Sequence, residues 1–477
     1  MVSSVTSLVD HLSGAGSHST VMIRIVVRPI RLERSVLTAL LLLLSQTTVA
    51  APLTPELLQA QIENVSQRSF VRMVERDGQR CEMFSTPEGI AMDNAEQEPL
   101  LAMACFASAV ERQGLSAVDG SIEAIAQLFL QHGLVEPVHQ LLSHAQNSGR
   151  RADQARLRFW LARYALETKN WTQAQRHKAQ ITNRYSLSAD QQDYLSLMRG
   201  VLLQLNRQHR HAIALYENFS ENSPLYPVAQ ANLALAYISQ GWWTDAYREI
   251  DQLLARPMEK PFHNRLRIAK GLSQLQQGFY RDARKTFRSV DRDSRYTGNA
   301  WLGIGLAALH LNDHPGALNA FQHLRATAGD TVDAHALLVA YTYERMGELV
   351  LAEASYTEAI AHYQNQINRY DARLSELSQG NLPNKLISDF DAIAQVPFFL
   401  GQDTHPTPPA LLRQYRLLVS LSEHVDDMAL RNELNRLQGL QKQRLAQQLY
   451  DEYQRRREQA QSYLSQSQYG LATVYDH

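Results

Sequence analysis

The sequence predicts an all-α fold in which short helix-turn-helix units are stacked, and two regularities lead to this prediction. An alanine recurs between residues 121 and 363 at separations of 38, 34, 37, 34 and 35 residues, the length of a two-helix unit. Twelve residues before each alanine stands another small residue, as expected where two helices approach closely. The alanines are Ala174, Ala212, Ala246, Ala283, Ala317 and Ala352, and the small residues before them are Ala162, Gly200, Ala234, Gly271, Gly305 and Ala340.

The turn inside each unit has its own signature, five residues before the alanine. Three units have glycine there, which predicts a residue with positive φ because glycine lacks a Cβ. These glycines are Gly241, Gly278 and Gly347, and other units have Lys169, Arg207 and Asn312 instead. Four residues after the alanine stands a bulky and mostly apolar residue in all units but the first, which has Lys178: Tyr216, Ile250, Phe287, Phe321 and Tyr356.

This pattern resembles that of the tetratricopeptide-repeat family, most clearly in residues 231–237 (ANLALAY), 240–243 (QGWW) and 245–246 (DA). The resemblance covers about half of the chain and implies a right-handed superhelical stack with one concave and one convex face. It also implies that the chain binds other proteins. The lysine and asparagine pair with which some family members grip a C-terminal carboxylate is missing, which disfavours a receptor for chaperone tails.

The first fifty residues are predicted to be a secretory signal peptide. Four arginines between residues 24 and 34 precede an apolar run at 36–44, and small residues follow up to Ala51. The run is shorter than the roughly 20 residues that span a bilayer, although a retained membrane anchor remains the alternative. We expect cleavage after Ala50, translation from either Met1 or Met22, and a mature protein in the periplasm of a Gram-negative bacterium.

Residues 51–119 are predicted to form a helical N-terminal cap that contains both cysteines of the chain. An exported protein can keep a disulfide, so a bond between Cys81 and Cys105 is expected, with two buried thiols as the alternative. Neither cysteine has a neighbouring cysteine or histidine at the spacing of a metal site.

The repeat array is expected at residues 120–365, with about six to seven repeats. Its weakest unit is the first, which has Pro137 and Val138 where the alanine would stand. First helices should line the concave face, and arginine and tyrosine there are frequent binding anchors. The partner-binding candidates are Arg163, Tyr194, Arg265, Tyr341 and Arg345. Counting along the first helices also places five other residues on the concave face: Phe159, Leu197, Ile268, Asn299 and Leu302. Some of these ten residues could instead complete the packing.

Residues 366–477 are predicted to be helical, with breaks at 380–383 and 404–409. An apolar patch at 396–400 is expected to dock on the stack, with a contact to a partner as the alternative. The long amphipathic stretch 411–453 could be a helical hairpin or a short coiled coil. Gln441 and Arg444 interrupt its apolar seam, which disfavours an extended coiled coil. A last short helix is expected from Tyr463 onward.

The charge balance and the absence of known motifs disfavour several classes of function. The 47 basic and 48 acidic side chains leave a formal charge of −1, so nucleic acid is an unexpected partner. No Walker loop, HExxH, GxSxG or paired CxxC motif occurs, and we expect neither a catalytic site, a metal nor a cofactor. The expected function is a non-catalytic periplasmic scaffold for other envelope proteins. The alternative is a regulatory or substrate-gathering subunit of an enzyme system for peptidoglycan or surface polysaccharide.

Overall fold

The computed structural model describes residues 55–77, 81, 99–118, 120–168, 170–327, 334–378 and 408–476, and all regular structure in these ranges is helical. The predicted all-α class is confirmed. The chain divides into compact units at 1–58 and 59–477, and the second holds the architecture described below. None of the described helices is both long and apolar enough to cross a bilayer. The predicted signal peptide and the patch at 396–400 lie outside the described residues.

In the described residues of the N-terminal cap lie α3 (Pro55–Asp77), α5 (Pro99–Gln113) and the short 3-10 helix η2 (Gly114–Val118). A disulfide joins Cys81 to Cys105 of α5, with 5.4 Å between the Cα atoms. Phe70 of α3 packs edge-on against Phe129 of the first repeat, with 5.7 Å between ring centroids. The cap therefore covers apolar surface at the start of the array.

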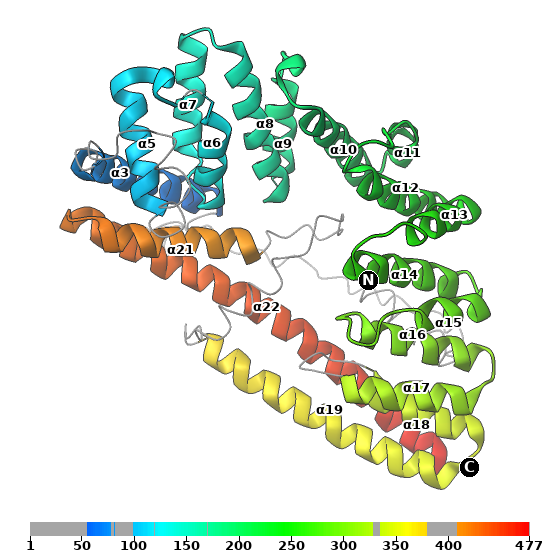
Figure 1. Ribbon diagram of the computed structural model, residues 1–477. Coiled ribbons are helices and arrows are strands. Elements are labelled where there is room, and N and C mark those ends of the chain that lie inside the picture. The colour runs from blue at the N-terminus through cyan, green and yellow to red at the C-terminus, as the bar shows by residue number, and fades with distance from the viewer. Residues whose placement is uncertain are drawn as a thin grey trace, which may run out of the picture. The chain divides into compact units, whose positions relative to one another are not determined.

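The array is a succession of antiparallel helix pairs that follow one another along the chain (Figure 1). Each first helix contacts its own second helix, and five of the seven described first helices also contact the second helix of the preceding pair. The pairs are α6 (Ile122–Gln131) with α7 (Glu136–Asn147), α8 (Arg151–Glu167) with α9 (Trp171–Ala179), α10 (Ala189–Leu205) with α11 (His209–Glu217), α12 (Tyr226–Gln240) with α13 (Trp243–Leu254), α14 (Lys260–Gln276) with α15 (Tyr280–Arg288), α16 (Thr297–His310) with α17 (His314–Thr327), and α18 (His335–Met346) with α19 (Leu349–Ser378).

Small residues sit where a ring from the second helix presses against the first. A Cβ added at Gly200 would overlap the ring of Tyr216, and one added at Gly305 would overlap that of Phe321. Gly271 lies in the same way against Phe287. The ring is the bulky residue four positions after the recurring alanine, and the alanines themselves are fully buried. In these three units the small residue before the alanine and the bulky residue after it are thus two sides of one contact.

The turns between paired helices have the predicted left-handed residue. Gly241, Gly278 and Gly347 have φ values of 75°, 79° and 77°. Arg207 and Asn312, which replace glycine in two other units, have φ values of 58° and 57°. The turn geometry is therefore kept where its preferred residue is absent, at the steric cost of a Cβ in the left-handed region.

The C-terminal region departs from the expected boundaries. The boundary at 365 falls inside α19, a helix of 30 residues. Beyond it, α21 (Pro408–His424) and α22 (Met428–Tyr475) pack along each other as a helical hairpin. The separate short helix expected from Tyr463 is wrong, because α22 runs unbroken for 48 residues. Asp427 caps its start by accepting hydrogen bonds from the backbone amides of Ala429 and Leu430, and no proline interrupts it.

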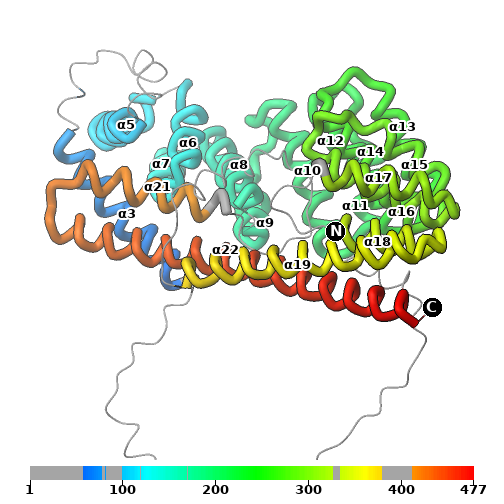
Figure 2. Tube along the Cα trace, turned by 90° about the horizontal axis from the view of Figure 1, so that it is seen from below, coloured from blue at the N-terminus to red at the C-terminus, as the bar shows by residue number. Residues whose placement is uncertain are grey.

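Helix α22 makes contacts with both ends of the array. Its C-terminal part runs alongside α19 (Figure 2), where Tyr363 of α19 faces Tyr463 of α22 with 5.5 Å between ring centroids. At the other end, Arg68 of α3 forms a 2.7 Å ion pair with Glu433 of α22, and Arg76 forms a 2.9 Å ion pair with Asp426 before it. One helix therefore connects the N-terminal cap to the last repeat.

Candidate functional site

The predicted partner-binding residues all lie on first helices, which also touch one another directly in several successive units, such as α6 with α8 and α14 with α16. We call the surface formed by the residues of these first helices that face away from their second helices the groove. The structure places the five candidates at three points along it. Arg163 and Tyr194 meet, Tyr341 and Arg345 lie one turn apart on α18, and Arg265 lies between the two pairs in the chain.

Arg163 and Tyr194 form the densest cluster of the groove. The Arg163 guanidinium on α8 lies 5.1 Å from the ring centroid of Trp160 on its own helix and 5.1 Å from that of Tyr194 on α10. Glu167 accepts a 2.8 Å hydrogen bond from Arg163 Nε. Burial raises the pKa of the Tyr194 hydroxyl, as does the nearby Glu167 carboxylate, while Arg163 lowers it. An arginine held between two rings keeps its charge at the surface with little freedom to move.

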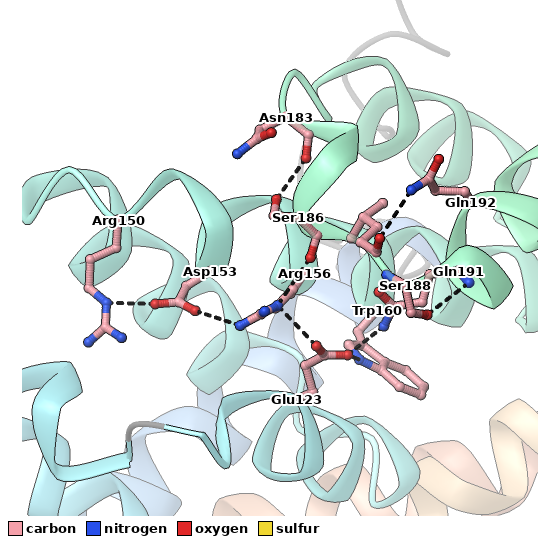
Figure 3. A network of polar contacts seen from close by, with 11 residues as sticks. Glu123, Arg150, Asp153, Arg156, Trp160, Asn183, Ser186, Ser188, Gln191 and Gln192 are labelled. Carbon is pink, nitrogen blue, oxygen red and sulfur yellow. Dashed lines mark hydrogen bonds and ion pairs between the residues drawn. The ribbon is translucent and has the colours of Figure 1, made fainter.

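A polar network centred on Glu123 links the units beside this cluster (Figure 3). Glu123 of α6 pairs through one carboxylate oxygen with Arg156 Nε at 3.2 Å. Its other oxygen accepts hydrogen bonds from Trp160 Nε1 at 3.2 Å and from Gln191 Nε2. Since α6, α8 and α10 belong to three consecutive units, this one carboxylate fixes how those units are oriented relative to one another.

The network extends along α8 through a buried aspartate. Asp153, of which 5% is exposed, lies with one carboxylate oxygen 3.5 Å from Arg156 Nη1 and with the other 2.6 Å from Arg150 Nε. A buried carboxylate needs such partners because burial in a low-dielectric interior disfavours its charge. Arg156 is consequently held from two sides, by Asp153 and by Glu123.

Helix α21 contributes a side chain to the same region from the C-terminal part of the chain. The Arg413 guanidinium lies 5.8 Å from the ring centroid of Tyr164 on α8. Arg413, Trp160, Arg163 and Glu167 together line a small recess beside α6. This end of the groove is therefore built from repeats and from the C-terminal hairpin.

Arg265 on α14 is more enclosed than the other arginines of the candidate set. Burial, which disfavours the charged form, lowers the pKa of its guanidinium to about 10, and Arg295 acts in the same direction. Tyr296 opposes the shift. The side chain still carries its charge at neutral pH, since that pKa lies well above 7.

Tyr341 and Arg345 lie one turn apart on α18. Tyr341 is half-buried, and this burial raises the pKa of its hydroxyl while the neighbouring Arg345 lowers it. Arg345 is exposed. The pair therefore offers an aromatic ring and a positive charge at the far end of the groove.

Three further residues that were counted as facing inward belong to the core. Phe159, Leu197 and Ile268 are only 2%, 4% and 5% exposed, so they complete the packing. Arg156 was missed, although it stands six residues before Ala162 as Tyr194 stands six before Gly200. The same count would have found it. In the described part of the chain no group of three or more His, Cys, Asp and Glu side chains is arranged to hold a metal.

Comparison with known proteins locates part of the array. The family model for the tetratricopeptide repeat matches residues 268–331, which run from α14 to the end of α17. A solved structure, a tetratricopeptide repeat protein from Parabacteroides merdae ATCC 43184, is 15% identical, with 61% of this chain and 99% of that chain covered and a TM-score of 0.34. No curated protein matches the chain in sequence.

Proposed function

Because this chain is a tetratricopeptide-repeat protein, we propose that it is a non-catalytic scaffold that holds segments of other cell-envelope proteins in the groove. Stacked repeats of this kind form extended surfaces for binding proteins. The observation that carries the proposal is the cluster of Trp160, Arg163 and Tyr194, which two adjacent units present together. The few residues that supply most of the binding energy in protein interfaces are enriched in tryptophan, tyrosine and arginine.

The cluster is also ordered before any partner arrives. Arg163 is held by two rings and by Glu167, and Trp160 is held by its hydrogen bond to Glu123. Immobilising a flexible side chain on binding costs about 0.5–1.5 kcal/mol, and that cost falls when the side chain is already fixed. This pre-organisation favours a binding role for these residues over a purely structural one.

The cell-envelope location rests on sequence features. The basic segment, the apolar run at 36–44 and the small residues after it are typical of a secretory signal peptide. The disulfide between Cys81 and Cys105 supports the same location, because such bonds persist mainly in oxidising compartments such as the periplasm.

Photocrosslinking in living cells tests the proposal. A benzoylphenylalanine residue placed at position 163 would lie in the groove, whereas one placed at position 281 would lie on the second helix α15. Both positions hold arginine, which is half-buried at 163 and exposed at 281, so the variants are matched in residue type and the control position is the more accessible one. We expect envelope proteins to be crosslinked from position 163 and not from position 281.

The identity of the captured proteins separates the two hypotheses from the sequence. Crosslinking mainly to an enzyme of peptidoglycan or polysaccharide assembly would favour the regulatory subunit. Capture from position 281 with none from position 163 would exclude the groove as the binding surface.

A further inference from the structure

A second recess, outside the groove, lies between α17, α18 and α19. We call it the α17–α19 cleft. Its volume is about 890 Å³, and its lining is polar in large part. The lining residues include Gln322 and Arg325 of α17, Tyr343 of α18, and Glu358, Asn365 and Arg369 of α19.

The cleft lies on the side of α18 opposite the groove. Successive residues of an α-helix are rotated by about 100°, so Tyr343 of the cleft points about 200° away from Tyr341 of the groove. Val339, which also lines the cleft, stands two residues before Tyr341 and is therefore rotated from it by about 200° in the opposite direction. Ligands of the two surfaces would therefore not compete for the same side chains.

One face of α19 supplies a continuous stripe of the cleft. Ser355, Glu358, His362, Asn365 and Arg369 follow at intervals of three and four residues, which places them above one another on a helix. The neighbouring face of α19, about 100° around the helix, is largely apolar and is covered, as the contact of Tyr363 with Tyr463 of α22 shows. The stripe extends so far because α19 is 30 residues long.

Two arginines give the cleft a positive charge at separate points. Arg325 Nη2 lies 2.9 Å from Glu358 Oε1, and both side chains are more than 60% exposed. An exposed pair of this kind contributes only about 0–1 kcal/mol, and the guanidinium keeps further N–H donors for another carboxylate. Arg369 is exposed and stands eleven residues after Glu358, which corresponds to about 16 Å along the helix.

We propose that the α17–α19 cleft binds an extended acidic segment of a partner polypeptide, with one carboxylate at Arg325 and another at Arg369. An extended chain advances about 3.3 Å per residue, so the two carboxylates would be about five residues apart. The side-chain amides of Asn365 and Gln322 can both donate to and accept from the backbone of such a segment. This site is independent of the groove in position and in chemistry.

Fluorescence anisotropy with the full chain tests the proposal. The probe is a fluorescein-labelled, C-terminally amidated peptide, Asp-Ser-Ala-Ser-Ala-Asp, and its matched control has asparagine in place of both aspartates. We expect the acidic peptide to bind and the control peptide to bind at least roughly tenfold more weakly, since charge-assisted hydrogen bonds to arginine are the strong ones. Arg325→Gln and Arg369→Gln should each weaken the acidic peptide by a similar factor.

Two control variants make the result specific. Arg281→Gln removes an exposed arginine of α15, outside the cleft, and should leave binding unchanged. Tyr341→Ala with Arg345→Ala removes the groove pair and should also leave it unchanged, which separates this site from the proposed function. Equal binding of both peptides, no effect of either cleft variant, or binding of neutral maltohexaose in place of the acidic peptide would overturn the proposal.

Discussion

Gly470 of α22 lies against the ring of Tyr356 in the way that Gly303 of α16 lies against Phe287 of the preceding repeat. In both contacts a Cβ on the glycine would overlap the ring. Tyr356 and Phe287 stand at the same position of their units, four residues after the recurring alanine. The end of α22 therefore takes the place that the first helix of a further repeat would occupy, and it closes the array.

This relationship predicts that Gly470→Leu destabilises the end of the array. The leucine side chain would enter space filled by the Tyr356 ring, and overpacking of this kind costs about 1–3 kcal/mol. The expected result is a lower urea midpoint in an equilibrium unfolding experiment. Gly439→Ala in the same helix is the control, because nothing lies near its Cβ and alanine there should stabilise by about 0.5–1 kcal/mol. Gly470→Leu with the stability of the wild type would contradict the capping role.

A second prediction concerns the turn between α10 and α11. Arg207 has a φ of 58° and is exposed, so glycine would relieve strain without removing a buried contact. Arg207→Gly should therefore raise the free energy of unfolding by up to about 1 kcal/mol, because relief of a left-handed strain of about 1–2 kcal/mol is partly offset by about 0.4–1 kcal/mol from the greater freedom of glycine in the unfolded chain. The reciprocal change Gly241→Ala, at a φ of 75°, should lower it by a similar amount. If both variants moved the denaturation midpoint in the same direction, the steric argument would fail.

The repeat register could be predicted from the sequence because its signals are local and steric. Gly305 must be small since Phe321 touches it, and Gly241 must be free to adopt positive φ, whatever the rest of the molecule does. The unbroken course of α22 was harder to predict. Its apolar residues face α21 near Leu434 and α19 near Tyr463, so no single stripe runs along the whole helix.

Only part of the candidate site could be predicted from the sequence, for the same reason. Counting from the small residue of each first helix placed Arg163 and Tyr194 on one surface, and the two side chains do meet. The contacts that neighbouring side chains make, Trp160 with Glu123 and Tyr164 with Arg413, could not be counted in this way. The contact with Glu123 depends on how neighbouring units are rotated relative to one another. Arg413 comes from a helix 250 residues later in the chain than Arg163.

The disulfide leads to a third prediction. Cys81 and Cys105 are 24 residues apart, and closing a loop of this length stabilises by about 3 kcal/mol in the chain-entropy model. Alkylation without reductant should leave both cysteines unmodified, and a reductant should lower the melting temperature of the cap. The double variant Cys81→Ser with Cys105→Ser should melt at the same temperature with and without reductant. Labelling of the native protein by iodoacetamide would show that the bond is not formed.

A fourth prediction follows from His177 on α9. Burial, together with the positive charge that His139, Arg158 and Arg176 can carry, lowers the pKa of this imidazole to about 4. The unfolded chain, with an ordinary histidine pKa near 6.5, then binds more protons than the folded chain between about pH 4 and pH 6.5. Stability should be highest above pH 6.5 and should fall as the pH drops through this range.

The contribution of His177 can be isolated by comparing urea midpoints at pH 7.5 and pH 5. His177→Gln should reduce the difference between the two midpoints, whereas His211→Gln, at an exposed position of α11, should leave it unchanged. An undiminished pH dependence in His177→Gln would assign the effect to other groups.

The last prediction addresses the groove at Tyr341 and Arg345. Replacing both by alanine should leave the circular dichroism nearly unchanged and lower the melting temperature only slightly, because the exposed Arg345 contributes within about 0.5 kcal/mol and the half-buried Tyr341 about 1 kcal/mol. Capture of partners from envelope extracts should nevertheless weaken, since the variant loses an aromatic ring and a charge together. Gly271→Leu provides the contrast, because its side chain would overlap Phe287 and should unfold neighbouring repeats at a cost of about 1–3 kcal/mol or more. If the groove pair lost no capture while Arg281→Glu and Arg288→Glu on α15 abolished it, partners would bind the second helices, and the assignment of the groove would be wrong.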